Sequence, residues 1–286
     1  MSRRWRVALG LAPALTLLAA LFGAALFGSL VQSLGHAPAY GVREFPTLRF
    51  YSAALHDPAF SAAALRTFAT AVPATALALL LGLALALAWP RAGGLARALG
   101  ALPLLVPYVV VVALASLWLS GGGVLARAAA ALGLIEVPQD FPQLVGGDAA
   151  VATVLAFAWK QVPFTALLVA AARTGARPEL DDVASVFGAS AWQRLRYVTL
   201  PQLAPALVAA GTLGLAYNLG ALEVPLLLDG GTRDTLAVAA WRAYADPDLT
   251  QRPHALAFAW LLSAAVLATV AALSAIARRW LPGVAP

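Results

Sequence analysis

The sequence has no cysteine, only three histidines and a single lysine, and charged residues make up only 11% of it. Without cysteine, neither a disulfide nor a thiolate metal site can form. His36, His56 and His254 are far apart in the sequence and show no ligand spacing. The G-x-x-x-x-G-K-[ST] loop that cradles nucleotide phosphates is also missing. We therefore expect no metal site and no catalytic residue in this chain.

What the sequence has in excess is apolar residues. They make up 62% of its 286 residues, and the mean hydropathy is +0.82. The apolar residues form repeated runs of about 20 or more, the length at which a helix spans a bilayer. The runs predict an all-α integral membrane protein with six transmembrane helices, at residues 7–31, 61–89, 100–119, 149–172, 201–228 and 254–277. A short outer helix is expected at residues 124–132.

The arginines between these runs predict the topology. Eleven arginines fall in the segments on one side of the membrane and six in the segments on the other. The positive-inside rule places both termini and the polar segment 177–201 in the cytoplasm. The net charge of +6 is thus explained by topology, and no nucleic-acid partner is expected. The first apolar run is longer than the core of a typical export signal, so it is expected to remain as a span.

The polar segment 177–201 lies between two long apolar runs and predicts a pair of short helices. Pro178 suits the first turn of a helix. Glu179, Asp181 and Asp182 place negative charge at the same end, where the helix dipole favours it.

An apolar stripe follows on the first of these helices, formed at helical spacing by Leu180, Val183, Ala184 and Phe187. Gly188 is expected to end the helix, because glycine readily adopts the left-handed conformation. Ser190 and Gln193 have the spacing of a capping box for a second helix. A helix with an exposed apolar stripe is suited to a groove on a partner protein. The alternative is a helix lying on lipid headgroups, but an anionic leaflet repels its acids.

The spacing within the polar segment resembles a known loop. Asp182-Val183-Ala184 is followed by three residues and Gly188, and nine further residues lead to Val198-Thr199-Leu200-Pro201. The permease subunits of binding-protein-dependent ABC importers carry Glu-Ala-Ala, three residues, Gly, nine residues and Ile-x-Leu-Pro. Every spacing matches, and the departures are Asp for Glu, Val for the first Ala and Val for Ile. The flanking Trp159-Lys160 and Pro163-Phe164 look like the preceding span of that family, and the stretch 220–225 looks like the fifth span of its polyamine, iron, sulfate and thiamine branch.

This resemblance implies a single permease domain over residues 1–286, with its core at 60–280 and a coupling loop at 173–201. It implies a multi-pass protein of the bacterial inner membrane that forms half of a translocation pathway for a small solute. The implied partners are a cytoplasmic ATPase dimer that uses the ATP, a second permease, an extracytoplasmic substrate-binding protein and membrane lipid. The residues implied to couple to the ATPase are Glu179, Leu180, Asp182, Val183, Ala184, Phe187, Gly188 and Pro201.

Two charged residues lie within or near the predicted spans, Lys160 and Glu223. Charged groups at such depth are costly and are by default functional hypotheses. The two side chains either pair with each other or line the solute path. Tyr217 and Asn218 are one to two turns from Glu223 and are further path candidates, although buried asparagine also joins membrane helices.

Two other classes of protein remain as alternatives. An ion-coupled secondary carrier would be expected to show an internal repeat or a series of buried carboxylates. An intramembrane transferase would need clustered acids for magnesium and diphosphate, and Asp181-Asp182 is the single adjacent acidic pair. Neither pattern is present, which favours the importer permease.

Overall fold

The computed structural model describes residues 3–147, 150–175, 177–229 and 233–280, and helices account for most of them. The chain divides into two compact units. One comprises Met1–Ala62 with Ala239–Ser263, and the other comprises Ala63–Val238 with Ala264–Pro286.

The first unit contains a long apolar helix and several short elements. These are α1 (Arg3–Ser33), the antiparallel hairpin of β1 (His36–Ala37) and β2 (Val42–Arg43), α2 (Arg49–His56), and parts of α12 (Leu236–Tyr244) and α13 (Arg252–Trp280). A small core joins Ala54, Ala240 and Phe258, and the ring of Phe60 meets that of Phe258 edge-on at 5.2 Å. The most apolar part of α1 buries no side chain, which suits a helix whose neighbours are lipid.

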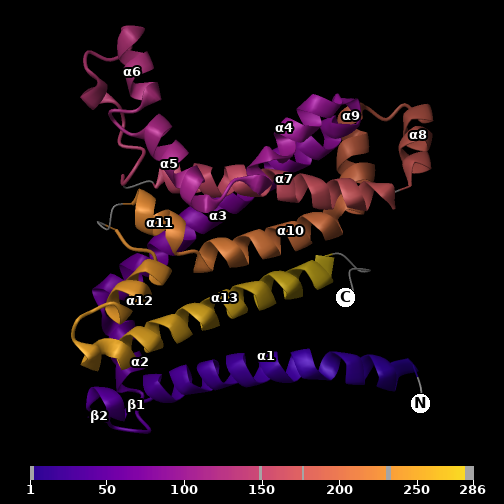
Figure 1. The fold of residues 1–286 in the computed structure, drawn as a ribbon. Helices are drawn as coiled ribbons and strands as arrows, with labels where there is room; N and C mark the ends of the chain where they lie inside the picture. The colour runs from indigo at the N-terminus through magenta and orange to yellow at the C-terminus, as the bar shows by residue number, and fades with distance from the viewer. Residues whose placement is uncertain (1–2, 148–149, 176, 230–232, 281–286) are drawn as a thin grey trace. The chain divides into compact units, whose positions relative to one another are not determined.

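The second unit contains three long helices that cross the predicted membrane, α3 (Pro58–Ala88), α7 (Val151–Thr174) and α10 (Leu200–Gly220) (Figure 1). Small residues let these helices approach closely. A Cβ added to Gly82 would lie 2.5 Å from the Cβ of Thr165, and one added to Gly214 would lie 2.8 Å from Oε1 of Gln161. Close backbone approach through small residues is how membrane helices gain packing without a hydrophobic driving force.

The third apolar run is not the single helix that residues 100–119 predicted. It forms α4 (Gly94–Leu105) and α5 (Tyr108–Leu119), separated at Val106 and Pro107. Val106 is extended, with φ −82° and ψ 122°, because the ring of a following proline disfavours the helical conformation. The apolar stretch of spanning length is Tyr108–Ala131, which includes α6 (Val124–Ala131). The short helix predicted at 124–132 is thereby confirmed.

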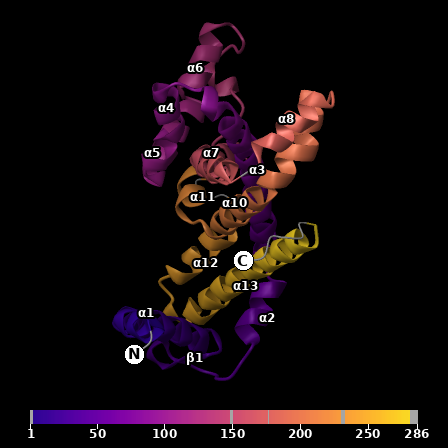
Figure 2. The ribbon, with the colours of Figure 1, turned by 90° about the vertical axis from the view of Figure 1, so that its right-hand side faces the viewer.

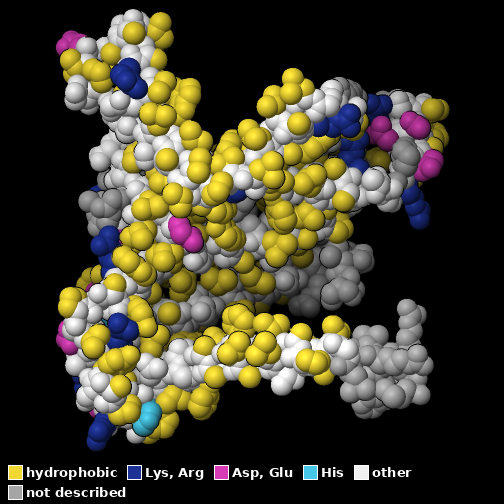
Figure 3. Space-filling view, in the orientation of Figure 1, with side chains coloured by type: hydrophobic (Ala, Val, Ile, Leu, Met, Phe, Trp, Pro, Cys, Tyr) yellow, Lys and Arg dark blue, Asp and Glu magenta, His cyan; other side chains and the backbone are white. Residues whose placement is uncertain are grey.

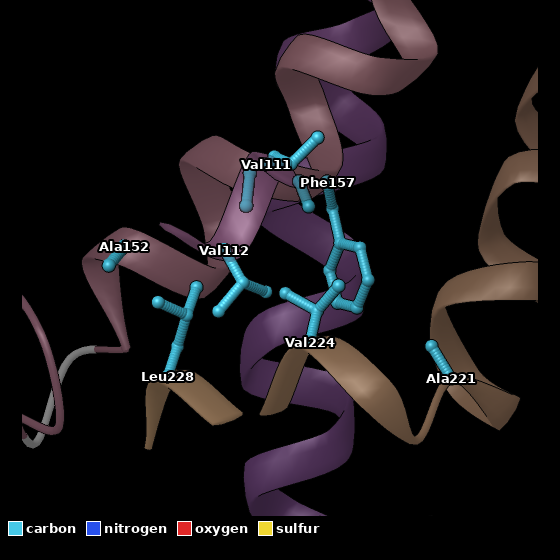
Figure 4. Packing of buried hydrophobic residues seen from close by; sticks show 9 residues of the cluster. Val111, Val112, Ala152, Phe157, Ala221, Val224 and Leu228 are labelled. Carbon is cyan, nitrogen blue, oxygen red and sulfur yellow. The ribbon is translucent and has the colours of Figure 1, made fainter. Parts of the chain in front are cut away.

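The fifth apolar run is also interrupted, which corrects the continuous helix predicted at 201–228. After α10 ends at Gly220, Ala221 is extended and the chain resumes as α11 (Glu223–Leu228). Pro225 has no N–H to donate to the carbonyl four residues earlier, so a helix continuing through Ala221 would lose that hydrogen bond. Figure 4 shows Val224 of α11 pointing into one apolar cluster with Val112 and Phe157.

Six segments of the described chain are long and apolar enough to cross a membrane, which confirms the number of spans predicted. The remaining two expected spans correspond to α1 and α13, which extend beyond the predicted 7–31 and 254–277 at both ends. The helices of the polar segment, α8 (Pro178–Val186) and α9 (Ala191–Arg194), follow α7 and precede α10. In the two views of Figures 1 and 2, α8 lies away from α6 and α11 within the second unit.

Candidate functional site

The polar segment folds as predicted, into two short helices separated by a glycine. Glu179 and Asp181 occupy the first turn of α8, which ends at Val186 and is followed by Phe187 as its C-cap residue. Gly188 has φ +80°, a conformation that favours glycine, and the N–H of Ala189 donates to the carbonyl of Ala184. The change of chain direction after α8 thus depends on the glycine.

A capping box opens the second helix, as the spacing predicted. The N–H of Gln193 donates to the hydroxyl of Ser190 at 3.3 Å, and the N–H of Ser190 donates to the Gln193 side chain at 2.8 Å. Beyond α9 the backbone forms a π-helical turn at Leu195–Thr199, which the sequence analysis did not predict. Pro201 follows in the first turn of α10 and has no N–H for the carbonyl of Tyr197, so the wider turn leaves no α-helical bond broken there.

The apolar stripe of α8 is exposed. Phe187 and Val186 are each 86% exposed, and Leu180 and Val183 are about half exposed. Val186 was not among the predicted residues, although its i+3 spacing from Val183 is a signal for the same face. Figure 3 shows acidic side chains gathered over this part of the chain. Large apolar side chains this exposed, with acids beside them, form a surface suited to a protein partner.

Three polar contacts lie within this loop or join it to the start of α10. Asp181 and Arg194 form an ion pair at 3.6 Å that joins α8 to α9. The N–H of Arg177 donates to the side chain of Gln202 at 2.8 Å, and that side chain donates to the carbonyl of Val198 at 3.0 Å. The hydrogen bond from Arg177 to Gln202 therefore joins the start of α8 to the first turn of α10.

Lys160 is held by backbone oxygens at the interruption between α4 and α5. Its Nζ donates to the carbonyls of Pro103 at 2.8 Å, Leu104 at 3.4 Å and Val106 at 2.7 Å. These carbonyls have no helical partner because α4 ends there, and a cation at a helix C-terminus is favoured. No ion pair joins Lys160 to Glu223 among the residues that the structure describes.

Tyr217 lies beside the same interruption. Its ring stacks on that of Tyr108, with centroids 5.3 Å apart and planes 17° from parallel, and Nζ of Lys160 lies 5.0 Å from the Tyr108 ring centre. Glu223 begins α11, directly after the second interruption, and is exposed. Both helix interruptions therefore lie near this group of three predicted path residues, Lys160, Tyr217 and Glu223.

Asn218 is placed differently from the other path candidates, because it is buried between helices. Its side chain exchanges hydrogen bonds with Gln161, at 2.6 and 3.3 Å, and donates to the hydroxyl of Thr75 at 3.0 Å. Only 3% of Asn218 is exposed. This geometry supports the alternative that Asn218 joins α3, α7 and α10.

Sequence reasoning overlooked a buried charged pair, Arg66 and Asp229. The guanidinium of Arg66 lies 3.5 Å from the Asp229 carboxylate and donates to the carbonyl of Gly147 at 2.9 Å. Thr153 donates to the same carboxylate at 3.1 Å. Burial raises the pKa of Asp229 above its ordinary value, although the nearby Arg66 opposes the shift. An arginine within the apolar run 58–88 was the signal for this pair.

Among the described residues, no group of three or more histidine, aspartate or glutamate side chains has the arrangement of a metal site. The charged side chains described above instead contact one another or backbone carbonyls, or are exposed to solvent.

Known proteins resemble the chain in sequence and in fold. Residues 78–284 match the family described as binding-protein-dependent transport system inner membrane component. The trehalose transport permease SugA of Mycobacterium tuberculosis is 34% identical over 179 residues, or 59% of this chain and 54% of SugA, so the match spans about half of that relative. The molybdenum transport permease ModB of the same species is 31% identical over 211 residues, or 70% of this chain and 75% of ModB.

Solved structures share the whole fold. A chain of a bacterial alginate ABC transporter, crystallised with an alginate-bound periplasmic protein, superposes with a TM-score of 0.80 over 98% of this chain and 96% of that one, at 18% identity. A second alginate importer gives a TM-score of 0.74. With six apolar helices of spanning length, these matches identify a multi-pass inner-membrane transport protein. The chain belongs to the family of inner-membrane permease components of binding-protein-dependent ABC transport systems.

Proposed function

We propose that this chain forms half of the translocation pathway of an ABC importer and couples it to a separate cytoplasmic ATPase. The observation that carries the proposal is the loop of α8 and α9, whose apolar stripe is exposed within a chain of permease fold. A groove on a soluble partner would bury this stripe and gain hydrophobic free energy. The chain itself binds no cofactor in this proposal, and ATP is used by the partner.

The coupling surface comprises the predicted residues Glu179, Leu180, Asp182, Val183, Ala184, Phe187 and Gly188, to which we add Val186. Pro201 lies at the edge of this surface, because it follows the π-helical turn and belongs to the first turn of α10. ATPase closure would pull on α8 and, through Gln202, on α10. Gly188 sets the direction in which the loop leaves α8.

The arginine distribution supports a topology with both termini and the α8–α9 loop in the cytoplasm. In this arrangement the loop lies on the side where ATP is available. Residues 1–286 act as one permease domain, with the core at 60–280.

The partners that complete the importer are an ATPase dimer, a second permease of the same or a related sequence, and an extracytoplasmic substrate-binding protein. The solved neighbour that carries an alginate-bound periplasmic protein supports a delivery partner of this kind. Lipid surrounds the spans, and no nucleic acid takes part.

The solute path is proposed to pass Lys160, Tyr217 and Glu223, near the two helix interruptions. Lys160 and the buried Asn218 shape this region through backbone and side-chain contacts, whereas Glu223 and Tyr217 have exposed surface for a solute. The two relatives are named for different solutes, trehalose and molybdenum. The proposal therefore names a small solute without assigning its chemical class.

Affinity purification of the tagged protein in mild detergent tests the proposal, with mass spectrometry to identify what is bound. We expect a stoichiometric ATPase with the wild type and its loss with Phe187→Asp, because a carboxylate would remain unpaired in the apolar contact. Leu134→Asp is the matched control, since Leu134 is also exposed but lies in the loop after α6. Retention of the ATPase by Phe187→Asp, or its loss with Leu134→Asp alone, would contradict the coupling surface.

A further inference from the structure

A cavity of about 350 Å³ lies beneath the α8–α9 loop, where α3, α7 and α10 meet it. Its apolar surface comes from Leu87 in the last turn of α3, from Leu195, and from Leu203 in the first turn of α10. Its polar surface includes Arg173, Arg177, Arg194, Asp181 and Asp182. The cavity thus joins the ends of three apolar helices to a cluster of charge.

The three arginines of this cavity differ in how many of their donors are used. Arg194 is paired with Asp181. Arg173 donates through Nη1 to the carbonyl of Ala86 at 2.9 Å and retains its other guanidinium donors. Arg177 is exposed, and its guanidinium makes no hydrogen bond or ion pair with any residue that the structure describes; its backbone N–H and carbonyl are both bonded, to Gln202 and to the N–H of Leu180. Arg173 and Arg177 therefore line the cavity and have guanidinium donors to spare.

The charge and shape of the cavity indicate its ligand. The ion pair of Arg194 with Asp181 leaves Arg173 and Arg177 against one further aspartate, Asp182, so the lining keeps an excess of positive charge. Guanidinium groups match phosphate oxygens with two parallel hydrogen bonds, and such charge-assisted bonds are about twice as strong as neutral ones. Asp182 is exposed and leaves room for a headgroup with its own donors, such as hydroxyl groups.

The position of the cavity along the spans indicates the source of that phosphate. Leu87 is one residue from the end of α3, and Arg173 is one residue from the end of α7, so the cavity lies at the level where apolar spans meet the polar headgroups. Basic pockets between the ends of membrane helices are sites at which anionic lipid headgroups bind. The leucines would contact the upper part of an acyl chain while the arginines contact the phosphate.

We propose that this cavity binds the phosphate group of an anionic membrane phospholipid, held by Arg173 and Arg177, and that the lipid ties the α8–α9 loop to the membrane surface. The proposal requires only that the apolar helices span a bilayer, so it does not depend on the identity of the ATPase or of the solute. One consequence is that the anionic lipid content of the membrane regulates how firmly the loop is seated.

Native mass spectrometry of the assembly as purified, titrated with phosphatidylglycerol in detergent, tests the site. We expect Arg177→Gln to weaken the tightest lipid binding by about tenfold, a loss that corresponds to roughly one charge-assisted contact. Arg177→Lys should retain part of the affinity, because a lysine binds phosphate as a point charge. Arg196→Gln is the matched control, because it removes the same charge from the same loop but does not line the cavity.

Four outcomes would overturn the proposal. Equal weakening by Arg196→Gln and Arg177→Gln would mean that lipid is attracted by the overall charge of the loop. Unchanged binding in both Arg177→Gln and Arg173→Gln, with each variant folded by circular dichroism, would place the lipid elsewhere. Displacement of the lipid by millimolar inorganic phosphate would identify a site for a soluble anion. Binding to the permease alone but not to the assembly with its partners would assign the cavity to a protein interface.

Discussion

The α8–α9 loop exposes apolar side chains to water, whereas the region between α3, α7 and α10 keeps polar side chains hydrogen-bonded. In the loop, Phe187 and Val186 are exposed, and the one ion pair among its described residues, Asp181 with Arg194, spans 3.6 Å. In the interior, Lys160 and Asn218 have their polar atoms bonded to backbone or to buried side chains. An apolar group left in water is available for a partner, whereas a polar group satisfied inside the bundle maintains the geometry of the helices. The candidate surface for a protein partner therefore lies where apolar side chains lack neighbours.

The largest effect is expected from Gly188→Val in the loop. Gly188 has φ +80°, which costs an L-residue about 1–2 kcal/mol and a β-branched residue more. We expect the chain to leave α8 in another direction and the ATPase to be lost on copurification. Gly188→Asn is the control, since asparagine tolerates this conformation, and it should retain the partner. Loss with both variants would show that the side-chain volume matters rather than the backbone.

An intermediate effect is expected from Lys160→Met in the interior. The substitution keeps a long apolar stem but removes the donor for three carbonyls at the end of α4. Hydrogen bonds to charged groups contribute about 1.5–3 kcal/mol, so thermal unfolding in detergent should begin about 4 °C lower. Lys160→Arg keeps hydrogen-bond donors at this position, so its unfolding temperature should fall by less. An unchanged melting temperature in Lys160→Met would show that the interruption is held by packing alone.

The smallest effect is expected from Asp181→Asn, which breaks the ion pair with Arg194. Both side chains are partly exposed and 3.6 Å apart, so the pair should contribute less than about 1 kcal/mol, and less at high salt. We expect a change in melting temperature of about 2 °C or less, similar to that of Asp182→Asn. A larger, salt-dependent loss in Asp181→Asn would mean that the loop is held by its charges as firmly as the interior is by its hydrogen bonds.

Local rules were sufficient for the loop but not for the interior. Gly188 as a helix stop and Ser190 with Gln193 as a capping box depend on residues within three positions of one another, and the structure has both. Pro107 indicated the interruption at residues 106–107, but the long apolar run around it favoured the prediction of one continuous helix. The contact of Lys160 with Val106 joins residues 54 apart in the sequence, which no spacing rule reaches. Which predicted residues touch a solute or an ATPase stays a prediction, because such contacts require the partner.

The hydrogen bonds between Gln161, Asn218 and Thr75 fix the register of α3, α7 and α10 relative to one another, so that gradual sliding of one helix along another is disfavoured. Sliding α10 along α7 by one turn, about 5.4 Å, would leave the amides without partners in an apolar surrounding. Intermediate positions would also bring Gly214 and Gln161 out of alignment at their closest approach. The three helices are therefore expected to move as one rigid piece. Motion during a transport cycle would then fall to the interruptions at residues 106–107 and 221–222, where few backbone bonds must break.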